Sequence, residues 1–108
     1  MPTLVPIPIP FKIASGAYKG TTSHHMILEA DGDIVVRAGE APSEFPMTEY
    51  WRSGTSQGSA CKKCTVAAAK DGVLTLKQGG KVLASFSPAE ITRLSKILDV
   101  PTNVTTSS

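Results

Sequence analysis

The chain has 108 residues, of which 41% are hydrophobic and 19% charged, and its formal net charge is +2. This length suits one domain with one core, and this apolar content excludes a chain that is disordered throughout. The charge is too small to indicate a nucleic-acid-binding protein by itself. A basic surface would have to come from clustering of the cations.

Residues 1–10 alternate apolar residues with four prolines and lack a basic start. This pattern predicts an extended arm, and it is unlike a signal peptide or a membrane-spanning helix. The arm has two alternative packing partners, its own domain or a neighbouring subunit. With no export signal, we expect a cytoplasmic protein without membrane association, in which both cysteines are reduced thiols.

Three turn sequences, at residues 30–32, 70–72 and 78–80, each separate two β-prone segments. Hairpins closed by three-residue loops are predicted at all three. The first hairpin would group Met26, Leu28, Ile34 and Val36 on one face. The second would align Val66 and Ala68 with Leu74 and Leu76. The third would add Val82, Ala84 and Phe86 to the face that carries Leu74 and Leu76. Lys77 and Lys81 would then lie opposite each other on the exposed face. A further strand is expected at residues 11–18.

After the last hairpin, residues 86–91 carry several helix-start signals. Ser87 can cap, Pro88 suits the first helical position and Glu90 completes a capping box, which predicts a helix at residues 88–99. Its apolar stripe comprises Ile91, Leu94, Ile97 and Leu98.

The predicted fold class is therefore α+β, an antiparallel β-meander of about five to six strands with one C-terminal amphipathic helix packed on one face. It forms a single domain at residues 11–100, with a long loop at residues 38–60. Residues 101–108 are expected to be a disordered tail.

A candidate binding surface begins in the segment at residues 49–64, which is rich in glycine and serine. Tyr50, Trp51 and Arg52 are predicted to stack on bases. Five lysines are predicted to contact phosphates: Lys62, Lys63, Lys70, Lys77 and Lys81. The same pattern is also consistent with lysines that only solubilise an exposed face and with a Trp51 that anchors the loop on the core.

Two resemblances point to single-stranded DNA binding. The Arg-Ser-Gly-Thr-Ser-Gln-Gly sequence of residues 52–58 resembles the DNA-binding wing of filamentous-phage single-stranded DNA-binding proteins, one residue shorter. The lysine-rich hairpin and following helix at residues 65–99 are similar in layout to PC4-like and Whirly-type single-stranded DNA binders. The small size and compactness of the chain favour a phage or plasmid origin.

Cys61 and Cys64 have the C-x-x-C spacing of zinc and dithiol redox sites. A structural zinc needs four ligands, and adjacent histidines on a strand point to opposite faces, so His24 and His25 together cannot complete the set. A thioredoxin-like site needs a helix N-terminus within a βαβ unit. We therefore expect incidental thiols, no metal and no cofactor. Since no catalytic motif is present, we also expect no enzymatic activity.

The sequence thus predicts a small nucleic-acid-binding protein that prefers single strands and forms a homo-oligomer, such as a dimer. The alternative is a structural or assembly protein, for example a virion subunit or an adaptor. That protein would use its N-terminal arm and long loop for protein contacts.

Overall fold

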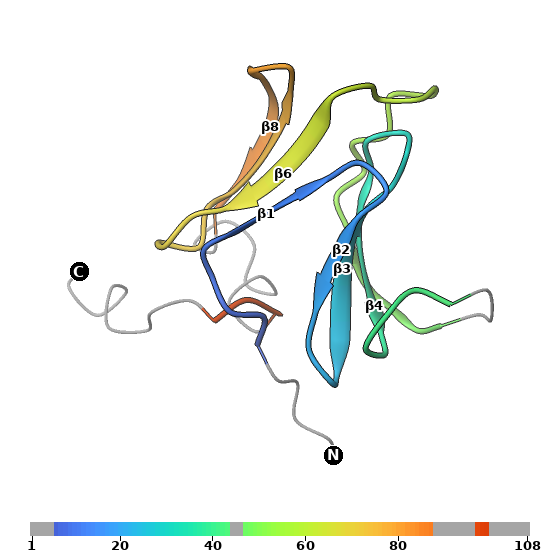
Figure 1. Ribbon diagram of the computed structural model, residues 1–108, viewed down its shortest axis with the longest axis vertical. Helices are drawn as coiled ribbons and strands as arrows, with labels where there is room; N and C mark the ends of the chain where they lie inside the picture. The colour runs from blue at the N-terminus through green and yellow to red at the C-terminus, as the bar shows by residue number, and fades with distance from the viewer. Residues whose placement is uncertain (1–5, 44–46, 88–96, 100–108) are drawn as a thin grey trace.

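The computed structural model describes residues 6–43, 47–87 and 97–99, and its eight elements are all β-strands in two four-stranded antiparallel sheets (Figure 1). The first sheet has the strand order β1 (Phe11–Ala14), β6 (Cys64–Ala68), β7 (Leu74–Gln78), β8 (Lys81–Phe86). The second has the order β2 (Tyr18–Gly20), β3 (His24–Leu28), β4 (Ile34–Ala38), β5 (Glu49–Arg52). No helix in the described ranges is long and apolar enough to cross a membrane.

One hydrophobic core lies between the two sheets. In β6, side chains alternate between buried and partly buried positions, as expected for a strand with one face on a core. The first sheet contributes Ile13, Val66, Ala68, Leu74 and Leu76, and the second contributes Met26, Leu28, Ile34 and Val36. Each sheet therefore covers the apolar face of the other, as in sandwich-like folds.

The predicted α+β class is consequently wrong, and so is the single sheet of five to six strands. The strand expected at residues 11–18 is split, because β1 pairs with β6 in one sheet and β2 pairs with β3 in the other. Between them, Ala17 N donates to Ala14 O at 2.9 Å, so the chain turns and changes sheets here. A further strand, β5, lies inside the segment expected to be a long loop.

Most of the predicted helix at residues 88–99 lies outside the described residues. Of its described part, Leu98 forms an isolated parallel bridge with Ile7. Ile7 N donates to Ile97 O at 2.8 Å, and Asp99 N donates to Ile7 O at 2.9 Å. Because Ile7 is fully buried, this part of the N-terminal arm packs on its own domain. Residues 1–5 of the arm and the tail at residues 101–108 also lie outside the described residues.

The first two predicted hairpins are confirmed. Met26 pairs with Val36 and Leu28 with Ile34, and the three-residue loop is closed by the bond from Glu29 N to Asp33 O at 2.8 Å. In the second hairpin, the register pairs Val66 with Leu76 and Ala68 with Leu74.

The third hairpin closes differently. Gln78 pairs with Lys81, so the loop has two residues, Gly79 and Gly80. Both have positive φ, at 57° and 98°, which a two-residue loop of type I′ requires and glycine adopts without steric cost. A bulge after Leu76 then brings Ala84 and Phe86 to the predicted core face. Val82 was predicted on that face as well, and this is wrong, because its side chain is exposed. Lys77 lies opposite the exposed Val82, so the predicted facing pair of Lys77 and Lys81 does not form.

His24 connects β3 to the described C-terminal residues. The side chain is fully buried, its Nε2 donates to Ile97 O at 3.1 Å, and its Nδ1 lies 2.8 Å from Ser23 Oγ. Burial lowers the pKa of His24, the bond to Ile97 opposes this, and the neighbouring His25 lowers the pKa further. The neutral imidazole is therefore the form that the folded protein favours.

We expect this histidine to make the protein less stable in mild acid. The folded pKa lies below the ordinary value of 6.5, so protons bind preferentially to the unfolded chain. The stabilisation is complete above that value and is lost as the pH falls through the folded pKa. Urea denaturation between about pH 8 and pH 5 should show this decline, and His24→Gln should flatten it. An equal decline in the variant would contradict the assignment.

Candidate functional site

Five charged side chains form a network that we call the ionic cluster, consisting of Glu29, Asp33, Arg37, Glu49 and Arg52. It lies on the outer face of the second sheet. Ile34 and Val36 of β4 point into the core, so Arg37 shares the opposite face with Val35. Val35 pairs with Arg52, and Arg37 pairs with Glu49, so β4 and β5 bring these charges together.

Arg52 is at the centre of the ionic cluster. Its Nη1 donates to Asp33 Oδ2 at 2.6 Å, and its Nη2 donates to Glu49 Oε1 at 2.8 Å. Glu29 lies 3.4 Å from Arg52 Nη1, and its other oxygen accepts from Arg37 Nη2 at 3.2 Å. The hydrogen bonds to Glu49 and then to Asp33 raise the pKa of Arg52. They outweigh desolvation, which lowers this pKa. This guanidinium is thus already committed to carboxylates.

Asp33 is the buried member of the cluster and organises the segment after β5. Its Oδ1 accepts from Ser53 Oγ and Gly54 N, both at 3.0 Å, and from Thr55 N at 3.3 Å. Burial alone would raise the pKa of Asp33, but the bonds from Arg52, Ser53 and Thr55 outweigh it and hold the pKa below its ordinary value. Asp33 is therefore an ionised anchor.

The segment at residues 52–58 folds back onto the loop between β3 and β4. Ser56 Oγ donates to Asp31 Oδ2 at 2.7 Å, and Gln57 N donates to Asp31 O at 2.7 Å. Because these polar groups are bonded within the protein, the segment is not an open wing.

The predicted stacking residues are placed differently from one another. Trp51 is half-buried, and its ring meets that of Phe86 edge to face, with 5.5 Å between centroids and 87° between planes. Tyr50 also packs against the core, with its ring centroid 6.4 Å from that of His24. Arg52 lies in the ionic cluster. Trp51 thus links the second sheet to β8 of the first, as in the anchoring alternative.

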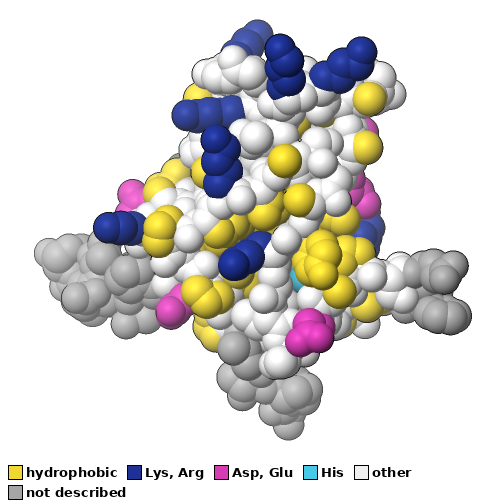
Figure 2. All heavy atoms as spheres, viewed as in Figure 1, with side chains coloured by type: hydrophobic (Ala, Val, Ile, Leu, Met, Phe, Trp, Pro, Cys, Tyr) yellow, Lys and Arg dark blue, Asp and Glu magenta, His cyan; other side chains and the backbone are white. Residues whose placement is uncertain are grey.

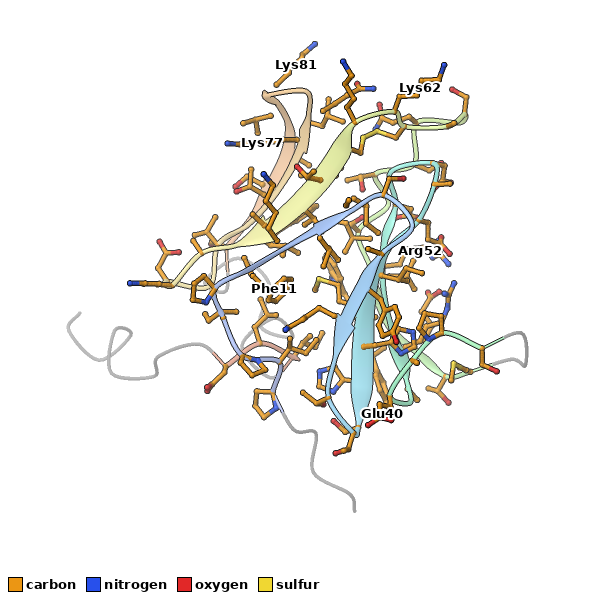
Figure 3. All side chains as sticks on the ribbon, in the orientation of Figure 1. Phe11, Glu40, Arg52, Lys62, Lys77 and Lys81 are labelled. Carbon is orange, nitrogen blue, oxygen red and sulfur yellow. A yellow bond between two sulfur atoms is a disulfide. The ribbon has the colours of Figure 1, made fainter. Side chains whose placement is uncertain are left out.

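The predicted phosphate-binding lysines divide into two groups. Lys62, Lys63, Lys77 and Lys81 gather at one end of the first sheet, where basic side chains are prominent in Figure 2. Lys70 lies in the loop at the opposite end of β6 and β7. Figure 3 shows Arg52 away from Lys62, Lys77 and Lys81. The structure therefore does not combine the eight predicted residues into one surface.

Cys61 and Cys64 are both buried and form a disulfide, so the expectation of reduced thiols is not met. Neither sulfur is then available as a thiolate ligand, which removes the zinc alternative considered for this pair. In the described ranges, no group of three or more histidine, cysteine, aspartate or glutamate side chains is placed to hold a metal ion.

Comparison with protein-family models and with curated protein sequences finds no match. Among solved structures, a monomeric monocot mannose-binding lectin from Gastrodia elata matches with a TM-score of 0.51 and 17% identity, covering 69% of this chain and 59% of the lectin. The Polygonatum cyrtonema lectin complexed with monomannoside matches with a TM-score of 0.50 and 18% identity, covering 70% and 63%. The chain spans about three-fifths of the length of these lectins. At this identity the match shows a shared fold.

These findings overturn the predicted function. The matching structures are mannose-binding lectins, and neither resemblance to single-stranded DNA-binding proteins is supported. The predicted nucleic-acid partner is corrected accordingly, and the predicted homodimer differs from the matching Gastrodia elata lectin, which is described as monomeric. The alternative of a structural, assembly or adaptor protein has no support in the comparison either.

The sequence interpretation missed the other members of the ionic cluster. Glu29, Asp33 and Arg37 lie at even spacings around a turn and strand, and this alternation puts them on one side of the second sheet. The interpretation of the binding surface considered cations and aromatic residues alone, and so assigned Arg52 to stacking on bases although carboxylates surround it.

Proposed function

We propose that the protein binds neutral carbohydrate, specifically mannose-type hexoses, at the ionic cluster. The observation that carries this proposal is the fold shared with two mannose-binding lectins. A hexose presents several hydroxyl groups, each able to donate and accept. Carboxylates accept hydrogen bonds and guanidinium groups donate them, so the ionic cluster can bond both the donors and the acceptors of a hexose.

The charge balance of the cluster favours a neutral ligand. Three carboxylates surround two guanidinium groups, which leaves one net negative charge and no uncompensated cation for an anion. Glu49 and Arg52 retain side-chain exposures of 41% and 39%, so their remaining lone pairs and N–H groups are accessible. A sugar can join this network without requiring a new charge to be buried.

The residues of the ionic cluster have two roles in the proposed binding, positioning and contact with the sugar. Asp33 is almost fully buried and holds Arg52 in position, whereas Glu29, Arg37, Glu49 and Arg52 supply the accessible polar atoms. Since these groups already bond one another, little side-chain entropy is lost when the ligand arrives. Binding involves no covalent step, and we propose a binding protein and not an enzyme.

The test is titration of the folded protein with methyl α-mannoside, followed by NMR chemical shifts, with galactose as the comparison sugar. Glu29→Gln/Glu49→Gln should weaken mannoside binding at least about tenfold, because each hydrogen bond to a charged group contributes about 1.5–3 kcal/mol and about 1.4 kcal/mol corresponds to tenfold. Glu40→Gln/Asp71→Asn removes two exposed carboxylates outside the cluster and should leave binding unchanged. Absence of mannoside binding by the wild-type protein, or equal loss in both variants, would refute the proposal.

A further inference from the structure

The end of the first sheet carries a second polar surface, which we call the lysine tip and which consists of Lys62, Lys63, Lys77 and Lys81. Lys62 and Lys63 lie between the two cysteines of the disulfide, and Lys77 and Lys81 lie on β7 and β8. Gln78 Nε2 donates to Lys62 O at 3.2 Å, and Gly79 N donates to Lys63 O at 3.2 Å. The disulfide-closed loop and the hairpin are thus joined into one unit.

The backbone of this loop holds a conformation that lysine rarely adopts. Lys63 has a φ of 60°, in the left-handed region, and is the non-glycine residue with positive φ in the described part of the chain. Such a conformation is unfavourable for a residue with a side chain and persists where surrounding structure maintains it. Here the disulfide and the bond from Gly79 provide that constraint, so the position of Lys63 is built into the fold.

In the described part of the chain, no carboxylate forms an ion pair with the lysine tip. The sequence contains no aspartate or glutamate at residues 61–68 or 74–86, which form the tip and its three strands. Within the described ranges, none of these four lysines takes part in an ion pair, and all are exposed. Like charges gathered in this way repel one another unless anions compensate them. The tip is therefore prepared for a ligand with several negative groups.

The surroundings of the lysine tip restrict the class of anion. Phe86 is at the far end of β8, and Trp51 packs against it, so neither of these rings is available there for stacking on bases. Val82 is the exposed large apolar side chain beside the lysines, which is too little for insertion into a membrane. Lysine ammonium groups act as point charges that accept sulfate or carboxylate oxygens without strict geometry.

We propose that the lysine tip is a second binding site, which takes the sulfate or carboxylate groups of an anionic polysaccharide. This site goes beyond the proposed neutral-sugar site, because it uses other residues and a different, salt-sensitive interaction. It does not depend on mannoside binding, and either site can be tested without the other.

The experiment measures binding of the full chain to heparin, which carries sulfate and carboxylate groups, and to hyaluronan, which carries carboxylates alone. Binding to heparin should weaken steeply as salt is raised. Lys77→Gln/Lys81→Gln should weaken it about tenfold, or about 1.4 kcal/mol, because the variant removes two exposed charge contacts. The matched control is Lys12→Gln/Lys70→Gln, which removes the same charge from exposed positions outside the tip and should change binding little.

Binding to hyaluronan as well as heparin would identify carboxylates as sufficient, whereas heparin alone would identify sulfate. Equal losses in the two double variants would overturn the proposal, because binding would then follow net charge. Preference for oligothymidine or for vesicles of anionic phospholipid over both polysaccharides would also overturn it. Titration of Lys77→Gln/Lys81→Gln with methyl α-mannoside separates the two proposals, since the tip variant should retain the neutral-sugar response.

Discussion

Replacing Asp33 with alanine is expected to lower the free energy of unfolding by about 3 kcal/mol. The change removes the acceptor of Arg52 Nη1, Ser53 Oγ and two backbone N–H groups, and it leaves the Arg52 guanidinium with one carboxylate partner fewer. The loss is large because donors in a part-buried site remain without an acceptor. Urea denaturation monitored by circular dichroism would measure it.

Asp33→Asn and the pH dependence provide the controls for this prediction. Asparagine keeps one acceptor oxygen, but it replaces the other with an amide N–H₂ group, which cannot accept a hydrogen bond. We therefore expect an intermediate loss of stability. The folded pKa of Asp33 lies below its ordinary value of 3.8, so its contribution is complete above that value and is lost as the pH falls through the folded pKa. Asp31 acts in the same direction, because Ser56 lowers its pKa. Asp33→Asn should therefore reduce, without abolishing, the decline below about pH 4. A loss under about 1 kcal/mol in Asp33→Ala would show that Arg52 and the following segment do not need this carboxylate.

Trp51→Ala is expected to cost about 3 kcal/mol, near the lower end of the range for large aromatic residues, because the side chain is half-buried. Trp51 belongs to β5 at the edge of one sheet, and Phe86 belongs to β8 at the edge of the other. Their edge-to-face contact stabilises the packing between sheets, and aromatic pairs of this kind add about 0.5–1.5 kcal/mol to their buried area. Denaturation followed by circular dichroism is required, since the variant lacks the tryptophan.

Trp51→Phe should recover part of the loss, and Phe86→Ala is the matched change on the other sheet. In a double-mutant cycle, Trp51→Ala and Phe86→Ala together should cost less than the two separate losses added, because each removes the same contact. Strict additivity would show that the rings do not interact energetically. If Trp51→Ala lowers the free energy of unfolding by less than about 1 kcal/mol, Trp51 behaves as a surface residue and does not stabilise the packing between the sheets.

Local features of the fold were predictable where turn chemistry and strand alternation agreed. Asp31-Gly32 and Asp71-Gly72 lie in the loops of the two confirmed hairpins, whose core residues alternate on one face. The predicted loop of the third hairpin was wrong because a bulge can correct the register after a two-residue loop. Strand alternation alone does not distinguish this arrangement from a three-residue loop without a bulge. The prediction of one strand at residues 11–18 was wrong because nothing in the local sequence specifies that β1 and β2 belong to different sheets.

In the candidate site, too, local features were predictable and contacts between distant residues were not. An arginine beside a tyrosine and a tryptophan is typical of nucleic-acid surfaces, and the sequence could not show that Arg52 would meet Asp33, nineteen residues earlier, at 2.6 Å. Likewise, the positions of Lys62 and Lys63 beside Lys77 and Lys81 depend on pairing between β6, β7 and β8, which also places Lys70 at the other end.

The sequence by itself determined the two Asp-Gly hairpins, their apolar faces and the basic character of residues 62–81, since turn preference, alternation and charge act over a few residues. The tertiary structure alone decided that two sheets cover each other, that Trp51 joins them, and that Arg52 pairs with carboxylates. These outcomes depend on which distant segments exclude water together. That choice is made by the burial of the whole chain and not by any local pattern.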